Sequence, residues 1–345
     1  MKLSRRILCA GAAALAATLA LPVGGSRAQE PVKIRVSIDT NLQHTRSKAI
    51  QMFADEVERR SDGAMEVELY HSAQLFNDKD VPRALRRGQI EMGAPGVWQL
   101  DALVPEGGIT MLPMFYGLPA DVTYAVVDGP VGEAINERIE EGLGVKVIGR
   151  WTDLGFQHTY STGKPIQSHE DMKGMKIRIP GGAINAFRVQ AVGGNPQLVP
   201  WADVPLALQQ GAVDALITTN MSAASAKLWD AGVKHAFLDQ QYFGQYVPMI
   251  GRDFWEDLTP EQQQVITDSW AAVIEQARAD AAAGQEDARK ELEEQGVTIV
   301  EPSQDELGTW RERLTETQGD LVEELGLDPE LVDRARAEIE KNAAS

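Results

Sequence analysis

The chain has 345 residues, of which 33 are Lys or Arg and 51 are Asp or Glu, for a formal net charge of −18 at pH 7. A chain this acidic is a poor partner for nucleic acid or an anionic membrane surface, because the phosphates would repel it. It is long enough to bury a sizeable core, and two domains are the expected organisation.

The first 28 residues are typical of an export signal. The basic start Ser4-Arg5-Arg6 precedes an apolar, Ala-rich run from Cys9 to Pro22, and the small residues Ser26 and Ala28 fit a signal peptidase site. The run is short for a membrane span and is not followed by a stop-transfer pattern. We therefore expect a signal peptide over residues 1–28, cleavage near Ala28 and a periplasmic mature protein. The arginine pair fits either the general or the twin-arginine export route.

Cysteine is absent from the expected mature chain, since Cys9 lies inside the signal. Disulfides and cysteine nucleophiles are therefore excluded, and the fold must depend on its core. Removing the signal removes four basic residues and no acidic ones, which leaves 29 Lys and Arg against 51 Asp and Glu, a net charge of −22. A body this acidic needs a local cationic site if it is to bind an anion.

The first half alternates between strand and helix patterns. Alternating apolar residues predict strands at 32–38 and 65–70, helical spacing predicts helices at 47–60 and 80–87, and a short apolar segment follows at 90–93. This order is typical of a parallel or mixed sheet covered by helices.

The same order recurs in the second half. We expect strands at 146–148, 176–179, 197–199 and 212–217, and helices at 183–192 and 205–210. The two halves therefore resemble each other as α/β units rather than forming one continuous sheet.

From residue 259 onward the pattern is helical. Thr259 suits an N-cap, Pro260 suits the first helical position and Glu261 adds an early acid. Helical spacing continues to Gln295 with few breakers, which predicts a helix long enough to cross the back of both halves. The last part, 305–341, is charged and helical.

The segment 171–181 brings a cation to the end of a strand. Lys176 and Arg178 are two residues apart, so they share one face of the predicted strand, and Pro180-Gly181 ends it just before a helix. A guanidinium beside a helix N-terminus suits a carboxylate, which it can bind through two hydrogen bonds. The alternative is a solvated basic face on an edge strand.

Sequence motifs for catalysis are missing. The chain has no dinucleotide-binding Gly-x-Gly-x-x-Gly, no phosphate-binding Gly-x-x-x-x-Gly-Lys-Ser/Thr and no Gly-x-Ser-x-Gly elbow. The five histidines contain no i,i+4 pair that would indicate a helical zinc site. We therefore expect a protein that is not an enzyme and that uses no cofactor or metal.

Two segments are specific in combination, Lys173-Gly174-Met175-Lys176-Ile177-Arg178-Ile179-Pro180 and Leu208-Gln209-Gln210-Gly211-Ala212-Val213-Asp214. With 72–80, 84–92 and 112–116 they resemble, in the right order, the extracytoplasmic solute receptors of tripartite ATP-independent periplasmic (TRAP) transporters, of the C4-dicarboxylate-binding type. The resemblance covers nearly the whole expected mature chain.

This resemblance implies an α/β fold of two domains that close on a ligand like a clamp, with mixed sheets flanked by helices and a long helix spanning both domains. Domain I is expected at residues 29–152 and 244–280, and domain II at 153–243 and 281–345.

It also implies capture of a small organic acid in the interdomain cleft and delivery to the membrane subunits of a TRAP transporter, by a monomer. Service to an ATP-driven importer or a sensor kinase is the alternative, and a secreted α/β enzyme is a more distant one.

In such receptors the arginine that matches Arg178 pairs with the substrate carboxylate. Family members often have Phe-Arg where this chain has Phe156-Gln157, and Gln157 can donate a hydrogen bond but brings no charge. We therefore expect a monoanionic head group, with a solvent-facing Gln157 as the alternative. Trp201 occupies a place where the family often has an aromatic against the ligand, unless it is an ordinary core tryptophan.

Other candidate ligand contacts lie in segments that face the expected cleft: Asn41, His44, Trp98, Trp151, Thr218, Thr219 and Asn220. With Trp201, the tryptophans suit a ligand with an apolar or ring portion. The chain departs from the family at Ala215, where glycine is usual, and at Thr218-Thr219, which replaces a more amide-rich stretch.

Overall fold

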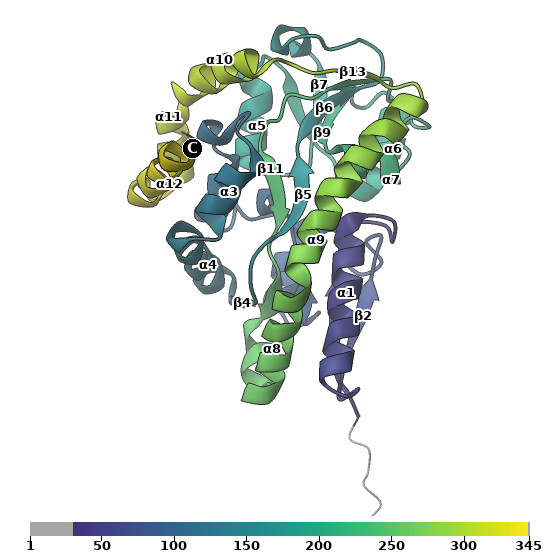
Figure 1. Cartoon of the computed structure of the whole chain (residues 1–345). Helices are drawn as coiled ribbons and strands as arrows, with labels where there is room; N and C mark the ends of the chain where they lie inside the picture. The colour runs from purple at the N-terminus through teal and green to yellow at the C-terminus, as the bar shows by residue number, and fades with distance from the viewer. Residues whose placement is uncertain (1–29, 344–345) are drawn as a thin grey trace, which may run out of the picture. The chain divides into compact units, whose positions relative to one another are not determined.

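Two mixed sheets and one long helix organise the chain, so the predicted α/β class is confirmed (Figure 1). The computed structural model describes residues 30–343. By their contacts, Pro31–Ser345 form one unit, and the description below concerns that unit alone. The predicted export signal, with Cys9, lies outside the described residues.

The first sheet has five strands in the order β2-β1-β3-β12-β4. Its members are β1 Val32–Ser37, β2 Met65–Tyr70, β3 Met92–Gly93, β4 Val145–Val147 and β12 Met249–Gly251. Strand β1 is parallel to β2 and β3, whereas β12 is antiparallel to β3 and β4. Alternate residues of β1, Ile34 and Val36, are fully buried, as the alternating sequence pattern predicts.

The second sheet has six strands in the order β13-β10-β6-β9-β7-β8. Its members are β6 His158–Ser161, β7 Lys176–Ile179, β8 Asn195–Leu198, β9 Ala215–Thr218, β10 His235–Phe237 and β13 Thr298–Val300. Strand β7 pairs in parallel with both β8 and β9, so it is not an edge strand. The alternative of a solvated edge-strand cation is therefore wrong for Arg178, which is only 3 % exposed.

Two strands carry the chain between the sheets. Strand β5, Thr152–Phe156, leads from β4 to β6, and β11, Phe243–Tyr246, leads from β10 to β12. They pair antiparallel as a separate two-stranded sheet. Gly155 in β5 has φ +114°, and a Cβ there would lie 2.9 Å from the Gln285 side chain, so a side chain at this position would be strained. Two of the predicted domain boundaries fall within these strands, and the division into domains stays a prediction.

The third connection is helix α9, Pro260–Glu294, the long helix that the sequence predicts. Thr259 and Gln262 form a capping box at its start, because the side chain of each accepts a hydrogen bond from the backbone of the other. The helix packs against α1 Thr45–Arg60 beside the first sheet and against α7 Asn220–Ser225 and β5 (Figure 1). It thus contacts a helix beside the first sheet, a helix that follows β9 of the second sheet, and a strand that connects the two sheets.

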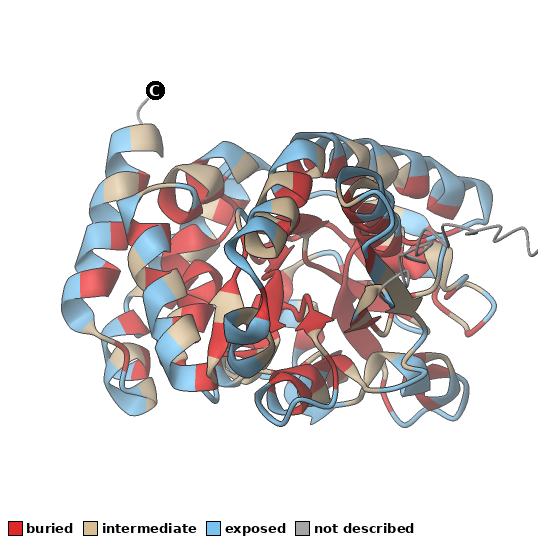
Figure 2. Cartoon of the chain, turned by 90° about the horizontal axis from the view of Figure 1, so that it is seen from below, coloured by how far each residue is buried: buried red, intermediate tan, exposed pale blue. Residues whose placement is uncertain are grey.

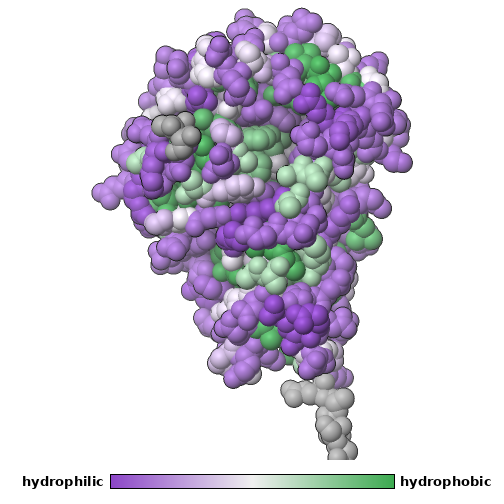
Figure 3. Space-filling view, in the orientation of Figure 1, coloured by the Kyte–Doolittle hydropathy of each residue, from purple (hydrophilic) through white to green (hydrophobic). Residues whose placement is uncertain are grey.

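Most of the remaining α-helices bury one face and expose the other (Figure 2). Their bounds are α2 Val81–Arg86, α3 Ala120–Val127, α4 Pro130–Leu143, α5 Ala183–Ala191, α6 Val204–Gln209, α8 Arg252–Asp257, α10 Gln304–Thr315, α11 Gln318–Leu325 and α12 Pro329–Ala343. Figure 3 shows a mostly hydrophilic face with smaller apolar areas, in keeping with the acidic composition. Within residues 30–343, no helix combines the length and apolarity needed to cross a membrane.

Arg278 attaches α9 to the start of β5. Its guanidinium donates to Asp128 Oδ1 at 2.9 Å and, through Nε and Nη2, to the carbonyl oxygen of Trp151 at 3.0 and 2.8 Å. The guanidinium carbon lies 4.6 Å from the ring centre of Tyr124. The Arg278 side chain is only 8 % exposed, and its Nε lies 3.8 Å from Oδ1 of the buried Asp153.

We expect Arg278→Met to lower the free energy of unfolding by about 3 kcal/mol, because it leaves the buried Trp151 carbonyl oxygen without this donor and the buried Asp153 carboxylate without its nearby cation. Arg289→Met is the matched control on the same helix, since Arg289 is 32 % exposed and pairs with Glu301 at the surface. The control should lose at most about 1 kcal/mol. Urea unfolding followed by circular dichroism measures both values, and equal losses would contradict the structural role of Arg278.

Candidate functional site

A pocket lies where strands of the two sheets end. Residues that follow β1 and β2 line it from the first sheet, and the ends of β7 and β9 line it from the second. The volume of this cavity is about 40 Å³, a few times the minimum for one water molecule. The carboxyl ends of parallel strands are the usual place for a ligand in an α/β protein, and this pocket suits a small one.

Arg178 is the buried cation of this pocket. Its Nε donates to the Val199 carbonyl oxygen at 2.9 Å and its Nη1 to the Ile217 carbonyl oxygen at 3.1 Å. Within the described residues, Nη2 has no hydrogen-bond partner and no carboxylate forms an ion pair with the guanidinium. Burial lowers the pKa of Arg178 to about 10, while the charge of Asp39 opposes that shift. The side chain is thus held in place by the backbone but lacks a counter-ion.

Two of the three predicted tryptophans line the pocket. The guanidinium carbon of Arg178 lies 5.5 Å from the ring centre of Trp201, within cation–π range. Trp98 packs edge-on against Tyr246, with ring centres 5.5 Å apart. Trp151 is instead 1 % exposed in the core, where its indole Nε1 donates to Asn136 Oδ1 at 2.9 Å.

Gln157 reaches the pocket from the residue between β5 and β6. It is 2 % exposed, so the alternative of a solvent-facing Gln157 is wrong. Its amide Nε2 is buried and has no hydrogen-bond partner among the described residues. Because an unpaired buried amide costs roughly 1–3 kcal/mol, this donor suits an acceptor supplied by a ligand or by water.

The structure places the other predicted residues at or near the ends of the same elements. Thr218, at the end of β9, lines the pocket. Thr219 caps α7 by accepting from the Ser222 backbone amide at 3.2 Å, and Asn220 Oδ1 accepts from the Tyr160 hydroxyl at 2.6 Å. These two side chains are bonded within the protein and are not pocket-lining residues.

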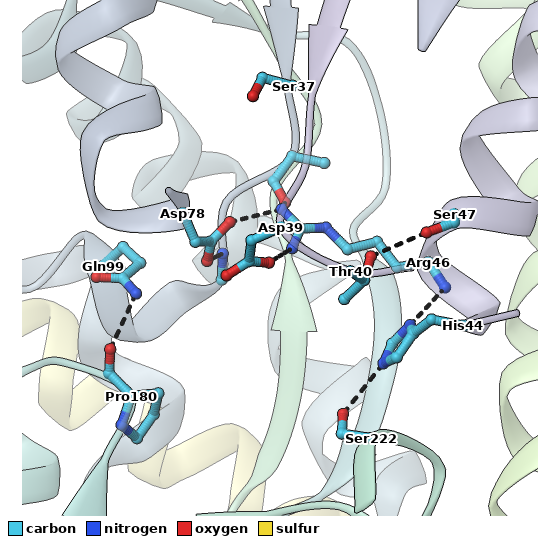
Figure 4. A network of polar contacts seen from close by, with 12 residues as sticks. Ser37, Asp39, Thr40, His44, Arg46, Ser47, Asp78, Gln99, Pro180 and Ser222 are labelled. Atoms are coloured by element: carbon cyan, nitrogen blue, oxygen red, sulfur yellow. Dashed lines mark hydrogen bonds and ion pairs between the residues drawn. The ribbon is translucent and has the colours of Figure 1, made fainter. Parts of the chain in front are cut away.

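Asn41 and His44 also lie outside the pocket lining, and both contact the helix that follows β9. Asn41 Nδ2 donates to the Ser225 carbonyl oxygen at 2.8 Å, and His44 Nε2 lies 3.0 Å from Ser222 Oγ (Figure 4). Burial lowers the pKa of His44 to about 3, so its ring is neutral at pH 7. These residues connect segments of the two sheets beside the pocket.

The N-terminus of α5 was expected to help Arg178 bind a carboxylate, and the structure differs from this expectation. The amide of Ile184 donates to Asp101 Oδ2 at 3.3 Å, so this terminal amide is used within the protein. The positive charge of the pocket on this side therefore comes from the Arg178 side chain.

Sequence reasoning missed the polar wall that the first sheet supplies. Asp39 and Asp78 line the pocket, and Arg46 on α1 lies between them and binds both (Figure 4). The available signal was the position of Asp39 directly after the first predicted strand. The long-range partner Asp78 had no local signal in a chain with so many acids.

The arrangement suits recognition of an anion. A fixed guanidinium, an unpaired amide and two indole rings surround a small space. In the part of the chain that the structure describes, no group of three or more His, Cys, Asp or Glu side chains is placed to hold a metal ion.

Comparison with known proteins agrees with this geometry. The family model described as bacterial extracellular solute-binding protein, family 7, matches residues 37–324. The C4-dicarboxylate-binding periplasmic protein DctP of Rhodobacter capsulatus is 27 % identical over 328 residues, which cover 94 % of this chain and 96 % of that protein.

Solved structures share the fold over most of the chain. The sugar acid binding protein DctPAm from Advenella mimigardefordensis, in complex with galactonate, has a TM-score of 0.85 at 23 % identity and covers 90 % of this chain and 99 % of its own. A TRAP periplasmic solute binding protein from Ralstonia eutropha, with bound (S)-2-acetolactate, has a TM-score of 0.83 at 25 % identity and the same coverage. The family model matches most of the length of this chain. The chain therefore belongs to family 7 of the bacterial extracellular solute-binding proteins.

Proposed function

We propose that this protein captures a small organic acid by binding its carboxylate to Arg178, and delivers it to the membrane subunits of a TRAP-type secondary transporter. The observation that carries the proposal is a buried guanidinium that lines the pocket without an ion-pair partner among the described residues. A buried charge without a counter-ion is costly, and a ligand carboxylate would supply one together with charge-assisted hydrogen bonds.

The names of similar proteins support this ligand class. The relative from Rhodobacter capsulatus is named for C4-dicarboxylates, and the two solved structures contain galactonate and acetolactate, which are also carboxylates. The structure from Ralstonia eutropha is named as a TRAP protein, which supports the same kind of membrane partner for this chain.

Contacts across the pocket support a clamp that closes on its ligand. Gln99 Nε2 donates to the Pro180 carbonyl oxygen at 3.1 Å, and His44 contacts Ser222 (Figure 4). The contact of Asn41 with Ser225 joins the same two sets of elements. In the proposed cycle these contacts form in the closed protein and break when residues 29–152 with 244–280 move away from 153–243 with 281–345. Strands β5 and β11 and helix α9 would serve as the hinge.

The proposal also covers the location of the protein, its oligomeric state and its lack of catalytic activity. The receptor works in the periplasm after its signal is removed near Ala28, as a monomer that can open and close. It is not an enzyme and leaves its ligand chemically unchanged, so it uses no cofactor. The extracellular description of its family supports this location.

We expect a thermal-shift screen over keto acids, hydroxy acids, sugar acids, aromatic acids and sulfonates to find carboxylates that raise the melting temperature. A ligand at one hundred times its Kd stabilises a protein by about 2.7 kcal/mol through mass action. The methyl ester of each hit is the control and should not stabilise the protein, because it cannot form the ion pair. A screen without any stabilising carboxylate would contradict the proposed function.

We expect Arg178→Ala to abolish detectable binding of such a hit, because a buried carboxylate would lose its partner, at a cost of about 2–5 kcal/mol. Lys176→Ala is the matched control on the same strand. It removes the same charge, but the Lys176 ammonium lies near the surface and donates to the Gly211 carbonyl oxygen. Titration calorimetry should give unchanged affinity for the control, and unchanged affinity for Arg178→Ala would exclude it as the anchor.

We expect Gln157→Met to weaken binding about tenfold, because the ligand loses one hydrogen bond worth roughly 1.5 kcal/mol. Methionine keeps the length of the side chain and removes the unpaired buried amide, so the ligand-free protein should melt at or above the wild-type temperature. Calorimetry and thermal unfolding together check both parts. A lower melting temperature with unchanged affinity would show that Gln157 serves the fold rather than the ligand.

A further inference from the structure

The first-sheet wall of the pocket is a buried ionic network around Arg46 (Figure 4). Arg46 Nη1 donates to Asp39 Oδ1 at 2.9 Å, and Nη2 donates to Asp78 Oδ1 and to the Ala94 carbonyl oxygen, both at 2.6 Å. The arginine is 1 % exposed, and its guanidinium carbon lies 4.1 Å from the ring centre of Tyr246. Packing and hydrogen bonds therefore fix the position of this network.

The two carboxylates of the network differ in the number of oxygen atoms that accept hydrogen bonds within the protein. Asp78 uses both oxygens, since Oδ2 accepts from the Gly96 amide at 3.1 Å. Asp39 uses only Oδ1, and its Oδ2 accepts no hydrogen bond from another described residue. The Asp39 side chain lines the pocket and is 10 % exposed. Asp39 thus offers the pocket one carboxylate oxygen that is available to a ligand.

The pocket therefore has two charged walls of opposite sign. On the first-sheet side, two buried carboxylates surround one buried guanidinium, so this buried network has a net negative charge. Arg178 supplies a positive charge from the second sheet, and the charges of Asp39 and Arg178 act on each other. Burial, with the nearby charge of Asp78, raises the pKa of Asp39 to about 6, so a hydrogen bond donated by a ligand would favour its charged form.

We infer that the ligand is a monocarboxylate that also carries a hydrogen-bond donor, a hydroxyl or an ammonium group, and that this donor binds Asp39 Oδ2. The inference rests on the proposed function and specifies the ligand class of the same pocket. Arg178 binds the carboxylate and Asp39 binds the donor, so the two ends of the ligand are distinguished.

Dicarboxylates are disfavoured for the same reason. With one carboxylate on Arg178, the second would face Asp39, and two like charges in a water-poor pocket repel each other. Lys79 also lines the pocket, but it is exposed, so water screens its charge. The pocket therefore selects by repulsion as well as by attraction.

Calorimetry on the mature protein with two matched series of probes tests this inference. The short series is propanoate, lactate, alanine and succinate, and the long series is hexanoate, gluconate and adipate. In at least one series, we expect the acid that carries a hydroxyl or ammonium group to bind at least tenfold tighter than both the unsubstituted acid and the dicarboxylate. The comparison of lactate with alanine tells which donor the pocket prefers.

Asp39→Asn tests whether Asp39 is the residue that selects. Asparagine keeps the shape and one acceptor for Arg46, but it removes the charge. We expect the preference for the substituted acid to fall at least fivefold and dicarboxylate binding to improve, while the unsubstituted acid keeps its affinity. Asp55→Asn, an exposed residue on α1 whose carboxylate accepts from Gln51, removes the same charge and should leave every ratio unchanged.

The outcomes separate this inference from the proposed function. If dicarboxylates or unsubstituted acids bind the wild-type protein as tightly as the substituted ones, or if Asp39→Asn leaves the ratios unchanged, the inference is wrong and the receptor function stands. If none of the probes binds, the inference is also wrong, and the broader screen decides the function. The wild-type ratios decide the ligand class even if Asp39→Asn does not fold.

Discussion

The pocket is built around a positive charge that is buried and oriented but has no carboxylate partner among the described residues. Arg178 is held by two backbone carbonyl oxygens, yet within the described residues it has no carboxylate partner. Such a group destabilises the ligand-free protein, because desolvation disfavours the charged form. In the proposed function, a carboxylate that enters the pocket would relieve this cost.

Other buried arginines show how the chain treats the same group when its role is structural. Arg46 is bonded to Asp39 and Asp78, and Arg278 to Asp128. Arg188 is also buried without a carboxylate partner among the described residues, but it donates to the Met111 and Leu112 carbonyl oxygens and does not line the pocket, whereas Arg178 does. One wall of the small pocket has Arg178, without a carboxylate partner, and the other has Asp39, which is bonded to Arg46. The inferred preference for a monocarboxylate with a hydrogen-bond donor follows from this difference between the walls.

The connections between the two sheets would let the pocket open while each of its walls stays rigid. Each wall is built on its own hydrogen-bonded sheet, which fixes Arg178 on one side and Asp39 on the other. Strands β5 and β11 and helix α9 join the two sheets, and Gly155 lets β5 pass close to α9. Small changes along these connections would separate the walls without disturbing either one.

The sequence by itself determined the elements whose pattern is local. The strand at 176–179, the capped helix that begins at Pro260 and the burial of alternate residues in β1 all follow from side-chain spacing and backbone preferences. Together with the resemblance, this spacing was enough to single out Arg178. Periodicity reports which residues lie on a buried face, but it does not report which distant segment covers that face.

Only the tertiary structure decided the rest. Trp98 and Trp151 both follow apolar segments, yet one lines the pocket and the other lies in the core beside Asn136. Likewise, Asp39 and Asp78 are 39 residues apart in the chain, and packing of α1 brings Arg46 between them. Spacing along the chain fixes local geometry, whereas contacts between distant segments are decided by how the finished core packs.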